Sequence, residues 1–299
     1  MSSTETKTES ELRLRGPQEG RYGRYHDPVR EPAAMRRIVA ENCAMNPGAA
    51  AVLLQIASKG VGQGVADHSS FTKRPVERAR RSMFYIYVMT FGTPEERRVV
   101  TDATHRAHSA VHKAGAYDAN DVELQLWVAA TMYWSLVLGY EEVYGKLDDD
   151  VADQVYEEFS VMATGLRVPP DKWPKDRNAF QAYWDDTLAK LEITEDAKKV
   201  ALDVLYPKKN LPWGLWLYAY ISGPFTRTTT TELLPERPRN EFGFPSTLYT
   251  QYLYWFMSMY NRTVYPALPD SVRHFLKNHY MADFRKRVES QRGKPIIKL

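Results

Sequence analysis

Within residues 121–144, DVELQLWVAATMYWSLVLGYEEVY, the stretch from Leu124 to Tyr140 is the longest nearly apolar run of the chain. Its apolar side chains cover nearly every side of a helical wheel, and a helix without a polar face is buried on all sides. Gln125, Thr131, Ser135 and Gly139 interrupt the segment, which falls short of the run of about 18 apolar residues that crosses a bilayer. We therefore expect it to be the central helix of a soluble protein.

The segments on either side of it repeat with the period of helices, and none shows a convincing strand alternation. The sequence Thr93-Pro94-Glu95-Glu96 is a capping box that begins a helix, expected to run to about Ala114. Gly60, Gly62 and Gly64 are typical of a flexible joint. Further helices are expected at 32–45, 47–60, 76–90, 148–164, 177–191, 194–205, 247–260 and 270–290.

The predicted fold class is therefore all-α, in a single globular helical domain over residues 31–299. Residues 1–30 are polar and charged and are predicted to form a disordered N-terminal arm. They contain no apolar leader, so we expect a cytoplasmic protein.

Composition excludes several classes of protein. The 299 residues carry 40 Lys and Arg against 37 Asp and Glu, a net charge of +3 that is too small for a nucleic-acid-binding protein. Cys43 is the one cysteine, so there is no internal disulfide, and it is expected in the core.

Two aromatic stretches, 211–221 and 248–260, are also expected in the core. The alternative for them is an interfacial face in peripheral contact with a membrane.

Three histidines, His105, His108 and His112, fall within the expected helix 93–114. On a helical wheel His108 lies about 60° from Val111, nearer the apolar side than the other two. We therefore expect His108 to point inward at the edge of the core. A lone inward histidine is more often a satisfied core residue than a metal ligand, and no His-Glu-x-x-His motif accompanies this one.

A basic cluster precedes these histidines. Five cations fall within nine residues: Lys73, Arg74, Arg78, Arg80 and Arg81. Cations are unfavourable at a helix N-terminus, so this density predicts an anionic partner such as a phosphate, a carboxylate or the propionates of a cofactor. Arg78 and Arg81 are expected to face that partner, and Arg80, about 200° away from Arg78, to face solvent.

Taken in order, several segments resemble the catalytic domain shared by fungal ER-bound oxygenases and bacterial rubber oxygenases. They are VLLQIASKGVGQGVADHSSF (52–71), RPVERARRS (74–82), VMTFG (88–92), HSAV (108–111), YDANDVELQLWVAATMYWS (117–135) and YEEVYG (140–145). The resemblance runs from about residue 33 to 190. It implies a helical fold around a b-type haem, which these enzymes use with O₂ to cleave carbon–carbon double bonds of isoprenoid chains.

The resemblance also implies roles for individual residues. The family's His-x-x-Val pattern falls on His108, which would be the axial ligand of the haem iron. Its Arg-x-x-basic-Thr motif falls on Arg78, Arg81 and Ser82, which would lie at the cofactor. The usual lysine of this motif is Arg81 here, and an arginine stays protonated and ligates iron poorly.

The family's Gly-Val-Ala-acid-His-Ser element falls on residues 64–69, which places Asp67 and His68 near the pocket as proton-handling groups. The family often has a histidine on the central helix at the position where this chain has Ala129. Fewer candidate ligands for the iron therefore remain.

The predicted function is that of a haem b-dependent oxygenase of secondary metabolism, which uses O₂ to cleave or oxidise a carbon–carbon double bond of a small lipophilic or prenylated metabolite. One alternative is a helical protein that binds haem or a lipophilic ligand without turnover. Another is monooxygenation or dehydrogenation on the same fold. Peripheral association with the ER membrane stays open, and the oligomeric state and the substrate's identity are not readable from the sequence.

Overall fold

The computed structural model describes residues 31–67, 75–206, 213–294 and 297–299. The predicted arm at residues 1–30 lies outside the described residues. So do His68 and the first two cations of the basic cluster, Lys73 and Arg74.

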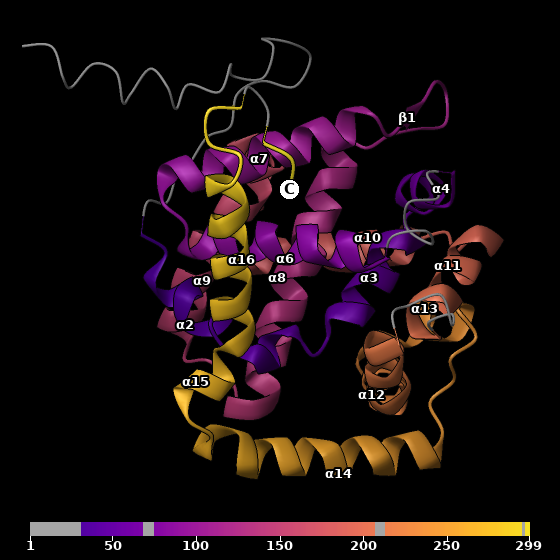
Figure 1. Ribbon diagram of the computed structural model, residues 1–299. Coiled ribbons are helices and arrows are strands. Elements are labelled where there is room, and N and C mark those ends of the chain that lie inside the picture. Colours follow the sequence, from indigo (N-terminus) through magenta and orange to yellow (C-terminus); the bar gives the residue numbers. More distant parts are fainter. Residues whose placement is uncertain (1–30, 68–74, 207–212, 295–296) are drawn as a thin grey trace, which may run out of the picture.

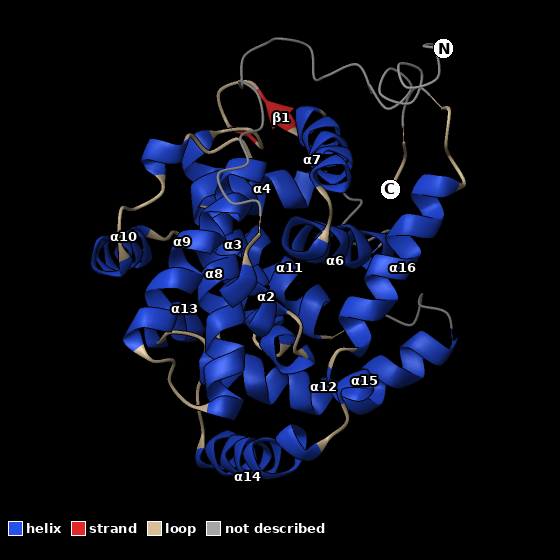
Figure 2. Cartoon of the chain, turned by 90° about the vertical axis from the view of Figure 1, so that its left-hand side faces the viewer, coloured by secondary structure: helices blue, strands red, loops and turns tan. Residues whose placement is uncertain are grey.

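The described part of the chain is almost entirely helical, which confirms the prediction of a single all-α domain (Figures 1 and 2). In chain order the elements are α2 (Ala33–Val39), η1 (Asn42–Met45), α3 (Gly48–Ala57), α4 (Lys59–Asp67), α6 (Pro75–Phe91), α7 (Pro94–Ser109), β1 (His112–Lys113), β2 (Tyr117–Asp118), α8 (Val122–Tyr144), α9 (Asp149–Gly165), η2 (Pro170–Lys172), α10 (Arg177–Lys190), α11 (Glu195–Leu205), α12 (Trp213–Leu233), α13 (Glu236–Glu241), α14 (Leu248–Val264), η3 (Tyr265–Ala267), α15 (Asp270–Arg273) and α16 (Phe275–Glu289).

Helix α8 passes through the middle of the molecule, as its sequence predicts (Figure 1). The Asp121 side chain caps its N-terminus by accepting hydrogen bonds from the backbone N–H groups of Glu123 and Leu124. Trp127 is 2% exposed and donates through its indole N–H to the Leu54 carbonyl at 2.9 Å, which ties α8 to α3. The apolar surface of α8 is thus removed from water on several sides at once.

The helix that begins at Thr93 is shorter than its sequence predicts. The capping box is present, but α7 ends at Ser109 and not at Ala114. His112 and Lys113 instead form the short strand β1, which pairs antiparallel with β2. Gly115 lies in the intervening turn with φ +74°, a conformation that glycine adopts without strain.

The glycine-rich segment 60–64 is helical, which corrects the prediction of a flexible joint. A Cβ atom added at any of these glycines would meet a neighbour. It would lie 2.8 Å from the Leu124 side chain at Gly60, 2.5 Å from the Ile56 carbonyl oxygen at Gly62 and 3.3 Å from the Tyr117 ring at Gly64. The glycines therefore allow close packing of α4, and this requirement outweighs their low helix propensity.

Both aromatic stretches are largely exposed where the structure describes them, so the expectation of core positions was wrong. Trp213 and Tyr220 on α12 are 81% and 69% exposed, and Tyr252 and Trp255 on α14 are 71% and 62% exposed. Helix α14 contributes no buried residue. Within the described residues, no helix combines the length and hydropathy needed to cross a membrane.

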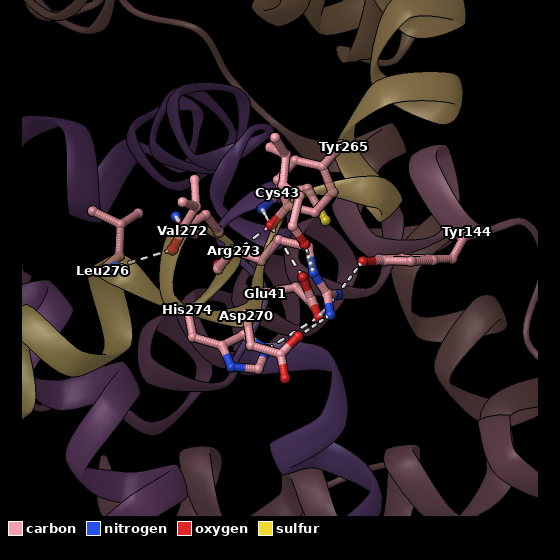
Figure 3. A network of polar contacts seen from close by, with 11 residues as sticks. Glu41, Cys43, Tyr144, Tyr265, Asp270, Val272, Arg273, His274 and Leu276 are labelled. Atoms are coloured by element: carbon pink, nitrogen blue, oxygen red, sulfur yellow. Dashed lines mark hydrogen bonds and ion pairs between the residues drawn. The ribbon is translucent and has the colours of Figure 1, made fainter.

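A polar network ties the last helices to the first (Figure 3). Arg273 forms an ion pair with Glu41, which is 6% exposed, and donates to the Tyr144 hydroxyl. The Tyr265 hydroxyl donates to Glu41 at 3.1 Å and accepts the backbone N–H of Cys43 at 3.1 Å. Because the buried carboxylate of Glu41 has cationic and hydroxyl partners, its desolvation is compensated.

The network also accounts for the environment of Cys43. The thiol is buried, as expected, and burial raises its pKa to about 12. A thiol that stays protonated at neutral pH is not a nucleophile. Cys43 is therefore a core residue.

Candidate functional site

His108 lies in the last turn of α7, where the chain turns towards the β1–β2 hairpin and the start of α8. Its Nδ1 atom is 3.0 Å from the amide nitrogen Nε2 of Gln125, in the second turn of α8. The same amide nitrogen donates to the backbone carbonyl of Ala119. The carbonyl can only accept, so the amide presents its second N–H to Nδ1 of His108.

His108 is neutral at physiological pH. Burial, followed by the positive charges of Arg78 and Arg167, lowers the pKa of its imidazole to about 4. A neutral ring keeps a nitrogen lone pair, which metal ligation requires.

His105 is more deeply buried than His108, contrary to the wheel argument. It is 4% exposed, and its Nε2 atom lies 2.8 Å from the Gly165 carbonyl oxygen, to which it donates. Burial, with Arg167 second, lowers the pKa of His105 to about 4. The buried Nδ1 atom has no hydrogen-bond partner in the part of the chain that the structure describes. His112 is exposed on β1.

Arg78 lies near the start of α6. Its side chain is exposed, and the protein close to its guanidinium lowers the pKa of that group to about 10 through desolvation. Arg78 also acts electrostatically on His108, and this connects α6 with α7.

Arg167 was not identified from the sequence. It follows α9, and its φ of +67° places a non-glycine residue in the left-handed region. Its charge lowers the pKa values of both His105 and His108. The left-handed turn after α9 thus adds one cation to the environment of both histidines, and at His108 this cation acts together with Arg78.

The remaining members of the basic motif lie apart from this pair. Arg81 is exposed and donates from Nε to the Leu299 carbonyl at 3.0 Å, and Ser82 is exposed. Arg80 forms an ion pair with Glu77 and lies 3.4 Å from Asp283 on α16. The cations that influence the pKa of His108 are Arg78 and Arg167.

Asp67, the last residue of α4, contacts the β1–β2 hairpin. Its carboxylate accepts hydrogen bonds from Lys113 Nζ and the Tyr117 hydroxyl, each at 3.2 Å. Tyr117 is 8% exposed, and its ring packs against Gly64. Asp67 therefore joins α4 to the hairpin that follows His108.

The amino-acid sequence is similar to those of two known proteins. The chain is 38% identical over 194 residues to two uncharacterized proteins, Rv2237 of Mycobacterium tuberculosis and Mb2261 of Mycobacterium bovis. The match covers 62% of this chain and 74% of each relative. No solved structure matches the chain significantly.

A family model is matched by most of the domain, over residues 35–263. This range includes α6, α7 and α8, which carry Arg78, His108 and Gln125. The chain therefore belongs to the family of the ER-bound oxygenase mpaB/B′ and rubber oxygenase catalytic domain.

Proposed function

We propose that this protein is a haem b-dependent oxygenase that uses O₂ to cleave a carbon–carbon double bond of a small lipophilic or prenylated metabolite. Membership of the oxygenase family supports the reaction class. The observation that carries the site assignment is His108, a neutral histidine whose Nδ1 is held by Gln125 and which has cations on two neighbouring elements.

The residues fit a haem in three respects. His108 is neutral, as a ligand must be. Haem carries two anionic propionates, and Arg78 and Arg167 supply cations around the same histidine. A haem iron needs only one or two protein ligands. A metal held by side chains alone needs about three or more, and no such group of His, Cys, Asp and Glu occurs within the described residues.

Gln125 has to adapt for this ligation. Binding through Nε2 places the ring proton on Nδ1, where it needs an acceptor. The Oε1 atom of Gln125 is buried and has no hydrogen-bond partner in the described parts of the chain, so an acceptor belongs to the same side chain. Rotation of the amide presents Oε1 to Nδ1 and removes a donor from the Ala119 carbonyl.

When bound, the haem supplies the redox chemistry towards O₂. His108 would hold it through Nε2, and the Gln125 amide would fix the plane of the imidazole. Arg78 would compensate the negative charge of a propionate. Asp67 takes up or returns a proton at its carboxylate, with the Tyr117 hydroxyl and Lys113 ammonium as its neighbours.

One observation favours a second candidate, a haem carrier without turnover. Arg81 stands where the resemblance expects a lysine near the iron, and its Nε is bonded to the Leu299 carbonyl. A guanidinium in that arrangement does not replace an amine that can lose its proton. The two candidates make the same prediction for haem binding and opposite predictions for O₂-dependent product formation.

The test begins with the absorption spectrum of the purified protein and a haem extraction assay. We expect one haem b per chain, and His108→Ala should remove the Soret band or change its axial-ligand signature. His112→Ala is the matched control. Haem loss from His112→Ala alone, with His108→Ala unaffected, contradicts the assignment of the ligand.

Turnover is tested with prenylated and isoprenoid substrates under labelled O₂. The oxygenase proposal predicts two carbonyl products that both carry label. Haem binding without any product supports the carrier. A labelled product with an intact carbon skeleton supports a different haem oxidation.

A further inference from the structure

Helix α9 ends in a turn that usually contains glycine. The Val168 N–H donates to the Ala163 carbonyl at 3.1 Å, and the Arg167 N–H donates to the Thr164 carbonyl at 2.9 Å, which is the hydrogen-bond pattern of a Schellman motif. The left-handed position of this motif is occupied by Arg167, with φ +67°. Within the described residues, Arg167 is the one non-glycine residue with a positive φ. The turn therefore holds an arginine where glycine is favoured.

The end of α13 provides a comparison within the same chain. The Phe244 N–H donates to the Arg239 carbonyl at 3.1 Å, and the Gly243 N–H donates to the Asn240 carbonyl at 3.0 Å. The pattern is that of the turn after α9, but its left-handed position is Gly243, with φ +82°. A side chain with a Cβ atom is disfavoured in this conformation. The turn after α9 thus carries a strain that the turn after α13 avoids.

Two neighbouring helices fix the turn after α9. The Tyr85 hydroxyl on α6 donates to the Met162 carbonyl at 2.6 Å, and Nε2 of His105 on α7 donates to the Gly165 carbonyl at 2.8 Å. Gly165 is buried, and a Cβ atom added there would collide with the Tyr85 hydroxyl and lie 2.7 Å from Cε of Met89. An unfavourable backbone conformation persists where the surrounding structure determines it in this way.

The contact between His105 and Gly165 carries a further cost. His105 is 4% exposed, and its Nε2 atom donates to the carbonyl. The lone pair of its Nδ1 atom is therefore buried without a hydrogen-bond partner among the described residues. A strained backbone and an unsatisfied atom thus lie on the two sides of one contact. Features that cost stability and persist together are typical of functional sites.

The side chain that this turn holds is a cation, and its charge acts on both histidines. It lowers the pKa values of His105 and His108, the latter together with Arg78. From the contacts of the turn we infer that His105 is a positioning residue, which holds the left-handed turn through the Gly165 carbonyl and thereby fixes the guanidinium of Arg167 relative to His108. The use of this cation rests on the proposed function, in which it would pair with a propionate of bound haem.

The effect of the cation is measured at His108 in the haem-free protein, by NMR titration of labelled histidine. Arg167→Gly should raise the pKa of His108, because it removes a positive charge. The thermal midpoint of this variant should not fall, because glycine adopts the left-handed conformation without strain. A lower midpoint with an unchanged pKa of His108 would make Arg167 a purely structural residue and would overturn the inference.

His105 is tested with a matched pair of variants. His105→Gln and His105→Leu both remove the ring that titrates near His108, but the amide Nε2 of glutamine can still donate to the Gly165 carbonyl. We expect a higher pKa of His108 in His105→Leu than in His105→Gln, because the turn has lost its donor. Circular dichroism verifies the fold of both variants. Equal pKa values of His108 in the two variants overturn the inference.

Haem affinity is the second measurement. Arg167→Gly and His105→Leu should each weaken haem binding by about tenfold or more, the usual cost of losing a group that supports a ligating histidine. His105→Gln should bind haem almost as the wild type does. In the Arg167→Gly background, His105→Leu should be no worse than His105→Gln, because the turn then has no cation to place.

An equal difference between His105→Leu and His105→Gln in both backgrounds would show that His105 acts independently of Arg167, and it overturns the inference. A wild-type protein that binds no haem would refute the proposed function. The titration of His108 needs no haem and still decides whether His105 positions Arg167.

Discussion

The amide nitrogen of Gln125 lies 3.0 Å from Nδ1 of His108, and the same nitrogen donates to the Ala119 carbonyl. One side chain of α8 therefore sets both the orientation and the proton position of the histidine at the end of α7. In the structure the neutral imidazole carries its proton on Nε2. Any ligand that needs Nε2 as an acceptor has to reverse this arrangement.

Gln125→Leu should weaken haem binding by about 10–100-fold, the usual cost of removing a group that orients a ligating histidine. The iron–histidine stretching frequency and the reduction potential should change with it, which a purely structural role would not produce. Gln55→Leu is the control. Gln55 also donates to a residue of α8, Thr131, at a distance of 3.0 Å, but this contact does not involve the histidines. Unchanged haem affinity in Gln125→Leu would show that the ring is held by other contacts.

Stability of the haem-free protein should depend on pH through His105 and His108. Both pKa values are lowered to about 4, so the unfolded chain binds more protons than the folded chain between about pH 6.5 and 4. Their contribution is complete above pH 6.5 and is lost as the pH falls through this window, by up to about 1.4 kcal/mol per pH unit for each histidine.

Denaturant titrations at several pH values measure this slope. His105→Gln and His108→Gln should each reduce it, although each also loses packing. His112→Gln, at an exposed position, is the control and should leave the slope unchanged. A slope that persists in the double variant His105→Gln/His108→Gln would assign the pH dependence to other groups.

Arg78→Met should raise the pKa of His108, because the positive charge of Arg78 disfavours the imidazolium. Haem retention should fall in the same variant, since it loses a cation that would pair with a propionate. NMR titration of labelled histidine in the haem-free protein gives the first quantity, and haem transfer to apomyoglobin gives the second.

Arg80→Met is the matched control for Arg78→Met. It removes contacts with Glu77 and Asp283 on the protein surface, which should cost at most about 1 kcal/mol of stability. It should leave haem retention as in the wild type. The same loss of haem from both variants would make the basic cluster an ordinary solvated helix face.

Gly62→Ala should destabilise the protein by about 1–3 kcal/mol, in spite of the better helix propensity of alanine. The new Cβ atom would lie 2.5 Å from the Ile56 carbonyl oxygen, and backbone cannot move aside as a side chain can. Gly48→Ala is the control, because nothing lies within 4 Å of the corresponding Cβ position. Thermal unfolding of the two variants measures the difference, and equal midpoints would contradict close packing of α4.

The boundaries of several helices could be predicted because their signals are local. Asp121 and Thr93 cap the helices that their sequences predict. The β1–β2 hairpin could not be predicted, because two-residue strands are too short to show an alternation. The helix at 59–67 was missed because its glycines indicate a joint, whereas packing against Leu124 and Ile56 is the reason for them.

Part of the candidate site could also be predicted. The resemblance selects His108 and Arg78, and the structure relates them electrostatically. Gln125 and Arg167 were missed because they meet His108 only through the packing of α7, α8 and α9, which no local pattern encodes. The exposure of α12 and α14 was missed since aromatic residues at helical spacing are usually core residues.

The ion pair between Glu41 and Arg273 joins residues 232 positions apart, and this separation has a consequence during translation. At about 5–20 residues per second, the ribosome adds Arg273 roughly 10–50 s after Glu41. Phe84 waits nearly as long for its edge-on contact with Phe284. Until its last helices emerge, the nascent chain therefore exposes apolar side chains such as Phe84 and leaves the Glu41 carboxylate unpaired. Exposed apolar surface of this kind is what chaperones shield.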